Sequence, residues 1–88
     1  MLASSETQVR LPAGVALHAR PAADFVRCAM RFQASIYVAF GDREADAKSL
    51  LTVLALGATG GSELTLRADG EDGPAALAAL ASCVDDFA

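Results

Sequence analysis

Apolar and polar residues alternate in four short segments of the chain, which is typical of half-buried β-strands. The clearest alternation places Ile36, Val38 and Phe40 on one face of a strand. Gly41-Asp42 is a turn signal immediately after it, so the next strand returns antiparallel. The four predicted strands cover residues 7–11, 35–40, 43–47 and 63–67.

Three other segments follow helical spacing. The first helix is expected to begin between Ala19 and Pro21, because proline is tolerated only in the first turn of a helix. Its apolar stripe comprises Ala22, Phe25, Val26, Ala29 and Phe32. A second helix is predicted over 50–56, with Ser49 at its N-cap and Gly57 ending it. The third begins at Pro74 and has the apolar stripe Leu77, Leu80, Val84 and Phe87.

The predicted order is β-α-β-β-α-β-α, with a β-β link too short for a parallel crossover. We therefore expect an α+β fold in two layers, an antiparallel four-stranded sheet with helices on one face. The 88 residues, 1–88, are expected to form a single domain, since that length is enough for only one core.

Composition excludes several classes of function. Apolar residues make up 53% of the chain and the net charge is −4, which argues against disorder, nucleic-acid binding and attraction to anionic membranes. No apolar run approaches the roughly 20 residues that span a bilayer, and no secretory signal is visible. Cys28 and Cys83 are too few for a disulfide framework or a zinc site, so we expect free thiols. A cytoplasmic protein is the expectation.

The single histidine, His18, precedes the first helix. Unpaired amide groups at a helix N-terminus hold anions, and Arg20 could bind phosphate oxygens with its guanidinium. These residues together suit an imidazole that accepts and releases a phosphoryl group. The residues alone leave open a plainer interpretation, in which His18 is a helix cap or surface residue. Neither metal chemistry nor nucleotide hydrolysis has support, because ligand clusters and a phosphate loop are absent from the sequence.

Two motifs carry a family resemblance. Residues 17–23, LHARPAA, closely resemble the active-site motif of the histidine-containing phosphocarrier (HPr) family of the bacterial sugar phosphotransferase system. Residues 47–57, AKSLLTVLALG, look like the serine-site motif of the same family. The resemblance extends from about Val9 to Phe87 and implies an open-faced β-sandwich with three helices on one face of the sheet.

The resemblance also implies a function. HPr-like proteins take a phosphoryl group from phosphorylated enzyme I and pass it to IIA domains of sugar permeases, as stoichiometric carriers and not as enzymes. By match, His18 would accept the group on Nδ1, with Arg20 stabilising charge and the backbone of Ala19 and Arg20 binding phosphate. Ser49 would be the target of a kinase and phosphorylase found in some bacteria. We expect a monomer with no cofactor and no metal site.

Ser49 and the residues around the second helix have alternative interpretations. Ser49 could serve only as a helix cap. Apolar residues at the start of this helix exceed one buried stripe, and at least Leu51 is expected to be exposed. The expected docking patch comprises Leu50, Leu51 and Leu54 with Ala19 and Arg27. Full burial of the three leucines is the alternative. Arg20, Arg27 and Arg31 share one helix face and could steer an acidic partner or form a solvated, ion-paired face with Asp24.

One position departs from the family pattern. The family usually has glycine before the Leu-His pair, whereas this chain has Ala16. If that position required a positive φ, alanine would cost roughly 1–2 kcal/mol, unless Gly14 takes up the turn. Two other functions remain open: a paralogous carrier, in a nitrogen-related or dihydroxyacetone kinase branch, and a regulatory module that binds a partner without phosphoryl transfer.

Overall fold

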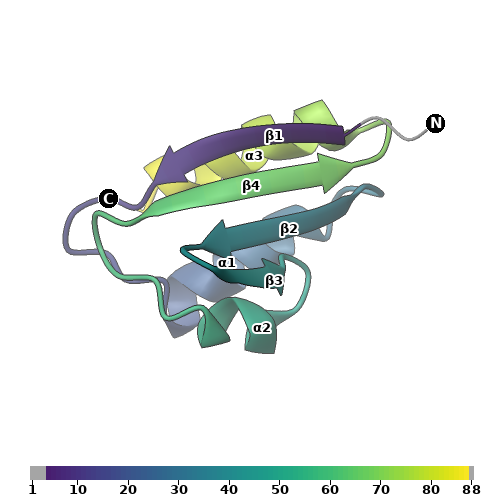
Figure 1. Ribbon diagram of the computed structural model, residues 1–88. Coiled ribbons are helices and arrows are strands. Elements are labelled where there is room, and N and C mark those ends of the chain that lie inside the picture. Colours follow the sequence, from purple (N-terminus) through teal and green to yellow (C-terminus); the bar gives the residue numbers. More distant parts are fainter. Residues whose placement is uncertain (1–3, 88) are drawn as a thin grey trace.

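Four antiparallel strands form one open sheet, and three helices pack on one of its faces (Figure 1). The computed structural model describes residues 4–87. The strand order is β1-β4-β2-β3, so the last strand of the chain lies in the middle of the sheet, beside the first. The elements are β1 (Ser4–Arg10), α1 (Ala19–Ala29), β2 (Ser35–Phe40), β3 (Arg43–Asp46), α2 (Leu50–Ala55), β4 (Glu63–Asp69) and α3 (Gly73–Asp85). The predicted order and the predicted α+β fold are confirmed.

The first strand differs from its predicted bounds. β1 begins three residues before the predicted residue 7, and its polar start pairs with the end of β4, Ser4 opposite Asp69 and Glu6 opposite Arg67. The backbone ladder supplies this pairing, and it requires no apolar side chains. Leu11 lies beyond the strand, where its N–H donates to the Ser62 carbonyl at 2.9 Å. The alternation of apolar residues therefore detected residues 7–10 of β1 and missed its polar start, residues 4–6.

Helix ends follow their local signals closely. α2 ends at Ala55, one residue short of the predicted 56, and Leu56 occupies the C-cap. Gly57 follows with φ of +68°, the left-handed conformation that ends helices at glycine. α3 begins at Gly73, so Pro74 lies in the first turn as expected.

The core lies between the sheet and the helices. Both predicted helical stripes face it, although Phe32 and Phe87 are only half-buried because each lies beyond the end of its helix. The largest fully buried side chains are Phe25, Leu11, Ile36, Leu64, Leu66, Leu80, Val38, Val53 and Val84. Apart from Phe25, these side chains are therefore aliphatic. The buried face of α1 belongs to the same core.

Asp72 joins two turns that lie at the same end of the molecule. Its carboxylate accepts the backbone N–H groups of Gln33 and Ala34, both at 2.8 Å. The bond from Gln33 in particular lowers the pKa of Asp72 below its ordinary value, because it stabilises the ionised carboxylate. The turn after α1 is thereby fastened to the start of α3.

The face of the sheet opposite the helices carries a charged cluster centred on Arg67. The guanidinium lies 4.5 Å from the centre of the Tyr37 ring. It also forms ion pairs with Asp69, at 2.9 Å, and with Glu44, at 3.7 Å. Single exposed ion pairs contribute little, but one partly exposed arginine here joins β2, β3 and β4.

Replacement of Arg67 by alanine is expected to lower the free energy of unfolding by about 1 kcal/mol, the sum of one cation–π contact and two weak ion pairs. Urea unfolding with an unchanged denaturant slope would measure it. Arg43→Ala is the matched control, because Arg43 is also a strand arginine, but it is exposed and donates only to the Ala55 carbonyl at 3.3 Å. Equal losses in both variants would contradict a specific role for the cluster.

Candidate functional site

His18 occupies the N-cap position of α1, at the end of the loop that follows β1. His18 is exposed, and its side chain makes no capping hydrogen bond. The backbone there is extended, with φ of −103° and ψ of −165°, which is usual at an N-cap. The imidazole is therefore accessible and does not hold the helix start. The alternative of a helix cap is correct for the position of His18 and wrong for its side chain, and the exposure of His18 agrees with the alternative of a surface residue.

The loop before His18 is held by contacts with the segment between α2 and β4. Leu17 is 3% exposed, and its N–H donates to the Ala58 carbonyl at 3.0 Å. Gly60 lies against the same loop: a Cβ there would come within 2.6 Å of the Gly14 backbone nitrogen and 2.9 Å of the Val15 nitrogen. Only glycine allows this approach. The segment between α2 and β4 therefore fixes the loop that presents His18.

Ala16 causes no backbone strain. Among residues 4–87, every residue with a positive φ is a glycine, and Gly14 has φ of +81°. The left-handed turn of this loop therefore falls at Gly14, and Ala16 adopts an ordinary conformation. Of the two possibilities that the sequence left open, Gly14 taking up the turn is the one observed.

The start of α1 offers two backbone amides beside the imidazole. Ala22 N–H donates to the His18 carbonyl at 2.8 Å, which is the first hydrogen bond of the helix. Pro21 has no N–H, so the amides that a helix start leaves without an intrahelical partner are those of Ala19 and Arg20. Both residues are exposed. An anion at the imidazole would meet these two donors and the positive end of the helix dipole.

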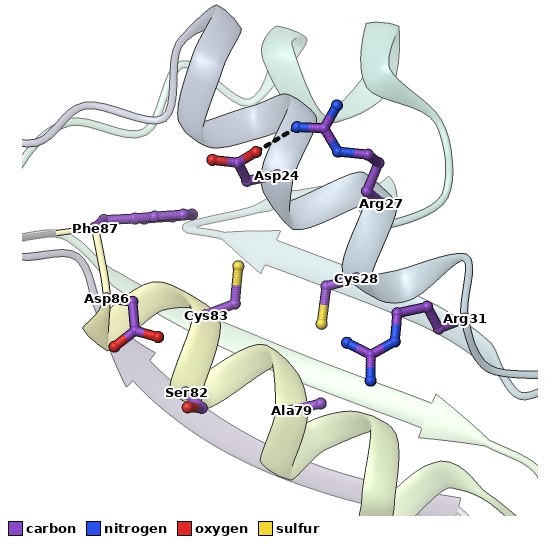
Figure 2. A pocket seen from close by; sticks show the side chains of 9 residues that line it. All are labelled: Asp24, Arg27, Cys28, Arg31, Ala79, Ser82, Cys83, Asp86 and Phe87. Atoms are coloured by element: carbon purple, nitrogen blue, oxygen red, sulfur yellow. Dashed lines mark hydrogen bonds and ion pairs between the residues drawn. The ribbon is translucent and has the colours of Figure 1, made fainter.

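The Arg20 side chain shares an open groove with His18. The groove has a volume of about 390 Å³ and is lined by Gly14, Val15, His18, Arg20, Pro21, Asp24, Asp86 and Phe87. Arg27 rather than Arg20 forms the ion pair with Asp24 (Figure 2). Within residues 4–87, Arg20 makes no ion pair, so its guanidinium is available to an anion at His18.

The C-terminal residues of this groove were not found by sequence reasoning. Asp86 and Phe87 follow α3, and they line the groove with His18 because α3 packs beside α1. Phe87 belongs to the predicted apolar stripe of the third helix, but nothing in the sequence around it relates it to His18. Only the packing of the two helices brings the chain end to the histidine.

The leucines of α2 are arranged as a partly exposed surface. Leu51 is 80% exposed and Leu50 is 40% exposed, while Leu54 is half-buried against the core. The expected exposure of Leu51 is confirmed, and full burial of all three leucines is wrong. Ala19 and Arg27 are exposed on the adjoining helix α1, which packs against α2. We call these five residues the α2 patch.

Ser49 lies at the N-cap of α2 but does not cap it with its side chain. The hydroxyl that bonds the backbone here belongs to Thr52, which donates to the Asp46 carbonyl at 2.9 Å. Ser49 itself is half-buried. The expectation that Ser49 is only a capping residue is therefore correct for its position and wrong for its hydrogen bonding.

The basic face of α1 is less uniform than its spacing indicated. Arg20, Arg27 and Arg31 are all exposed, but Asp24 neutralises Arg27 and Arg31 lies over the Phe32 ring, 5.7 Å from its centre. Arg20 is thus the cation of this face that lies closest in sequence to the histidine and is open to a ligand.

Other kinds of site receive no support from the described part of the chain. No group of three or more potential metal ligands occurs within residues 4–87. No helix over that range is long and apolar enough to cross a membrane.

Comparisons with known proteins point to one family. The family model described as "PTS HPr component phosphorylation site" matches residues 4–86. A multiphosphoryl transfer protein of Xanthomonas campestris is 42% identical over 93% of this chain, which spans only 10% of that longer protein. The HPr-like protein Crh of Bacillus subtilis is 38% identical over 97% of this chain and 98% of its own length.

A solved structure agrees with these relatives. The phosphocarrier protein HPr of Bacillus anthracis superposes with a TM-score of 0.88 at 36% identity. The superposition covers 93% of this chain and 98% of that one. The likeness therefore includes the whole arrangement of sheet and helices and not the histidine motif alone.

Proposed function

The chain belongs to the HPr family of phosphocarrier proteins, and we propose that it carries a phosphoryl group on His18 between partners of the phosphotransferase system. Phosphorylated enzyme I would be the donor, and IIA domains of sugar permeases the acceptors. The observation that carries the proposal is the exposed imidazole of His18 at the start of α1. It makes no capping hydrogen bond, and it lies in one groove with Arg20. The proposed carrier works in the cytoplasm as a monomeric single domain.

The proposed chemistry is a direct transfer between two imidazoles. A lone pair on Nδ1 of His18 attacks the phosphorus of the partner's phosphohistidine, and the partner's N–P bond breaks as the new one forms. Charge on the transferred oxygens is met by the Arg20 guanidinium and by the amides of Ala19 and Arg20. The chain supplies position and charge, and it is a stoichiometric co-substrate that needs no bound cofactor.

The test uses enzyme I and phosphoenolpyruvate labelled in its phosphoryl group. We expect one label per chain, labile in acid and stable in alkali, because a phosphoramidate bond forms. The label should leave when an IIA domain is added. A label that survives acid, or no label after prolonged incubation with active enzyme I, would contradict the proposal.

The α2 patch is the proposed docking surface. Leu50 and Leu51 are exposed on α2, which packs against α1, and they resemble the apolar anchors that fill pockets at protein interfaces. Leu51→Asp is expected to raise the KM of enzyme I for this carrier by about 10- to 100-fold with little change in kcat, since it removes binding and not chemistry. Steady-state kinetics with varied carrier concentration would measure both constants.

Met30→Asp is the matched control for Leu51→Asp. Met30 is also a large exposed apolar residue, at 64%, but it lies at the C-cap of α1, at the opposite end of this helix from His18. An equal rise in KM for both variants would mean that general surface apolarity, and not the α2 patch, accounts for the effect.

We propose Ser49 as a regulatory phosphorylation site where a matching kinase and phosphorylase exist. Its side chain makes no capping hydrogen bond, and it immediately precedes the exposed leucines. A phosphate there would place nearly two negative charges at the edge of the α2 patch, so an acidic partner would be repelled. Inhibition of docking is the physically expected result.

A second candidate function is suggested by the match with the HPr-like protein Crh over nearly the whole chain. In that alternative the chain would act as a regulatory carrier or binding module through the α2 patch. The presence of His18 and Arg20 in one open groove favours the carrier. The labelling experiment separates a carrier from a module that only binds, because such a module would accept no acid-labile label, and transfer of the label to an IIA domain distinguishes the sugar carrier from a regulatory carrier.

A further inference from the structure

Two thiols face each other between α1 and α3. Cys28 belongs to α1 and Cys83 to α3, and each sulfur points toward the opposite helix (Figure 2). Both residues line the same groove between the two helices. These are the chain's only cysteines, and both are free. Two cysteines 55 positions apart in sequence are therefore brought together by the packing of the first and last helices.

An open groove borders the thiol pair. Both residues line an open groove of about 550 Å³ between the two helices. That volume is in the range that small-molecule ligands occupy. Cys28 is 8% exposed, whereas Cys83 is half-buried. A small reagent that enters the groove therefore reaches Cys83 without unfolding of the protein, and the buried Cys28 borders the same space.

Charges around the groove distinguish the two sulfurs. Burial raises the pKa of Cys28, but the nearby Arg31 guanidinium opposes that rise. Burial also raises the pKa of Cys83, to about 11, and the negative charges of Asp24 and Asp86 add to it. Both thiols are thus protonated at neutral pH. The Arg31 guanidinium favours the thiolate of Cys28, whereas the neighbouring carboxylates disfavour that of Cys83.

We propose that Cys28 and Cys83 form an intramolecular disulfide by exchange with a low-molecular-weight disulfide such as oxidised glutathione. The thiolate of one cysteine attacks one sulfur of the reagent, whose S–S bond breaks and releases one thiolate, which takes up a proton. The other cysteine then loses its proton and attacks the protein sulfur of the mixed disulfide, which releases the second thiol. Two protein thiols are oxidised to one disulfide, and the reagent is reduced to two thiols.

The disulfide would act as a reversible covalent link between the two helices. It closes a long loop of chain, so it restricts the unfolded state more than a short-range link would. In a reducing compartment the pair stays as thiols, and in an oxidising one it closes. The link lies in α1, one residue before the last of the helix, so His18 at the other end remains exposed.

The test equilibrates the wild-type chain with mixtures of reduced and oxidised glutathione at mildly alkaline pH. Mass spectrometry should show loss of two hydrogen atoms and no retained glutathione. The effective concentration of the two thiols is expected to be at least about 10-fold higher in the folded chain than in the same chain unfolded in guanidinium, because the fold holds them together. The oxidised protein should also melt at a higher temperature than the reduced one.

Cys28→Ser and Cys83→Ser supply the controls, since each retains one thiol and should give only the mixed disulfide. The wild-type comparison does not depend on either variant folding. Mixed disulfides on the folded wild-type chain would overturn the proposal. So would an effective concentration no greater in the folded chain than in guanidinium.

Discussion

A His18→Ala variant is expected to accept no phosphoryl group from phosphorylated enzyme I, a loss of at least about 1,000-fold in rate, because it removes the attacking nitrogen. His18 is the only histidine in the chain, so no second imidazole can substitute for it. Quench-flow measurement of the acid-labile label, with the wild-type chain in parallel, would give the ratio of rates.

The fold should be unaffected by this change. His18 is exposed and its side chain makes no capping hydrogen bond, so the free energy of unfolding is expected to change by less than about 0.5 kcal/mol. Urea unfolding of both proteins separates loss of chemistry from loss of structure. Retention of an acid-labile label in a folded His18→Ala chain would refute the assignment of His18 as the acceptor.

An Arg20→Ala variant is expected to transfer the group about 100-fold more slowly, in line with the loss of one preorganised donor to a developing anion. The guanidinium shares the groove with His18 and, within residues 4–87, has no ion-pair partner that competes for it. Arg20→Lys should recover part of the rate, since lysine keeps the charge but lacks the fork that binds two oxygens. Single-turnover transfer from phosphorylated enzyme I would measure all three chains.

Arg31→Ala controls for general charge, because Arg31 is an exposed arginine of the turn that follows the same helix. Its effect should be small and should vanish at high salt, where long-range steering is screened. The effect of Arg20→Ala should persist, since it acts at contact distance. If the two effects declined together with salt, Arg20 would be a steering residue and not part of the transfer site.

Much of the fold could be predicted because local signals and burial agree. Pro21, Gly57 and Pro74 bound helices by rules that act within a few residues, and the helix stripes face the core as their spacing indicated. The start of β1 could not be predicted this way. Its polar residues are ordered by pairing with β4, whose paired residues lie more than 60 positions later in the chain.

The residues of the candidate site likewise divide into those that local sequence signals reveal and those that only the packing reveals. Sequence could select His18, Arg20 and Leu51, because a motif and an excess of apolar residues mark them. It could not predict that Gly60 supports the histidine loop, since a close backbone approach leaves no trace in hydrophobic spacing. Nor could it predict that Cys28 and Cys83 line one groove, because that depends on how two helices distant in sequence pack together.

Pro21, the third residue of α1, limits how firmly this helix start can grip an anion. A binding site designed to retain phosphate would use every amide of the first turn, but here the ring nitrogen of proline withholds one of them. A phosphoryl group on His18 would therefore meet only two backbone amides of this helix start and the Arg20 guanidinium. Few noncovalent contacts fit the proposed carrier, because a carrier must release its phosphoryl group as readily as it accepts one.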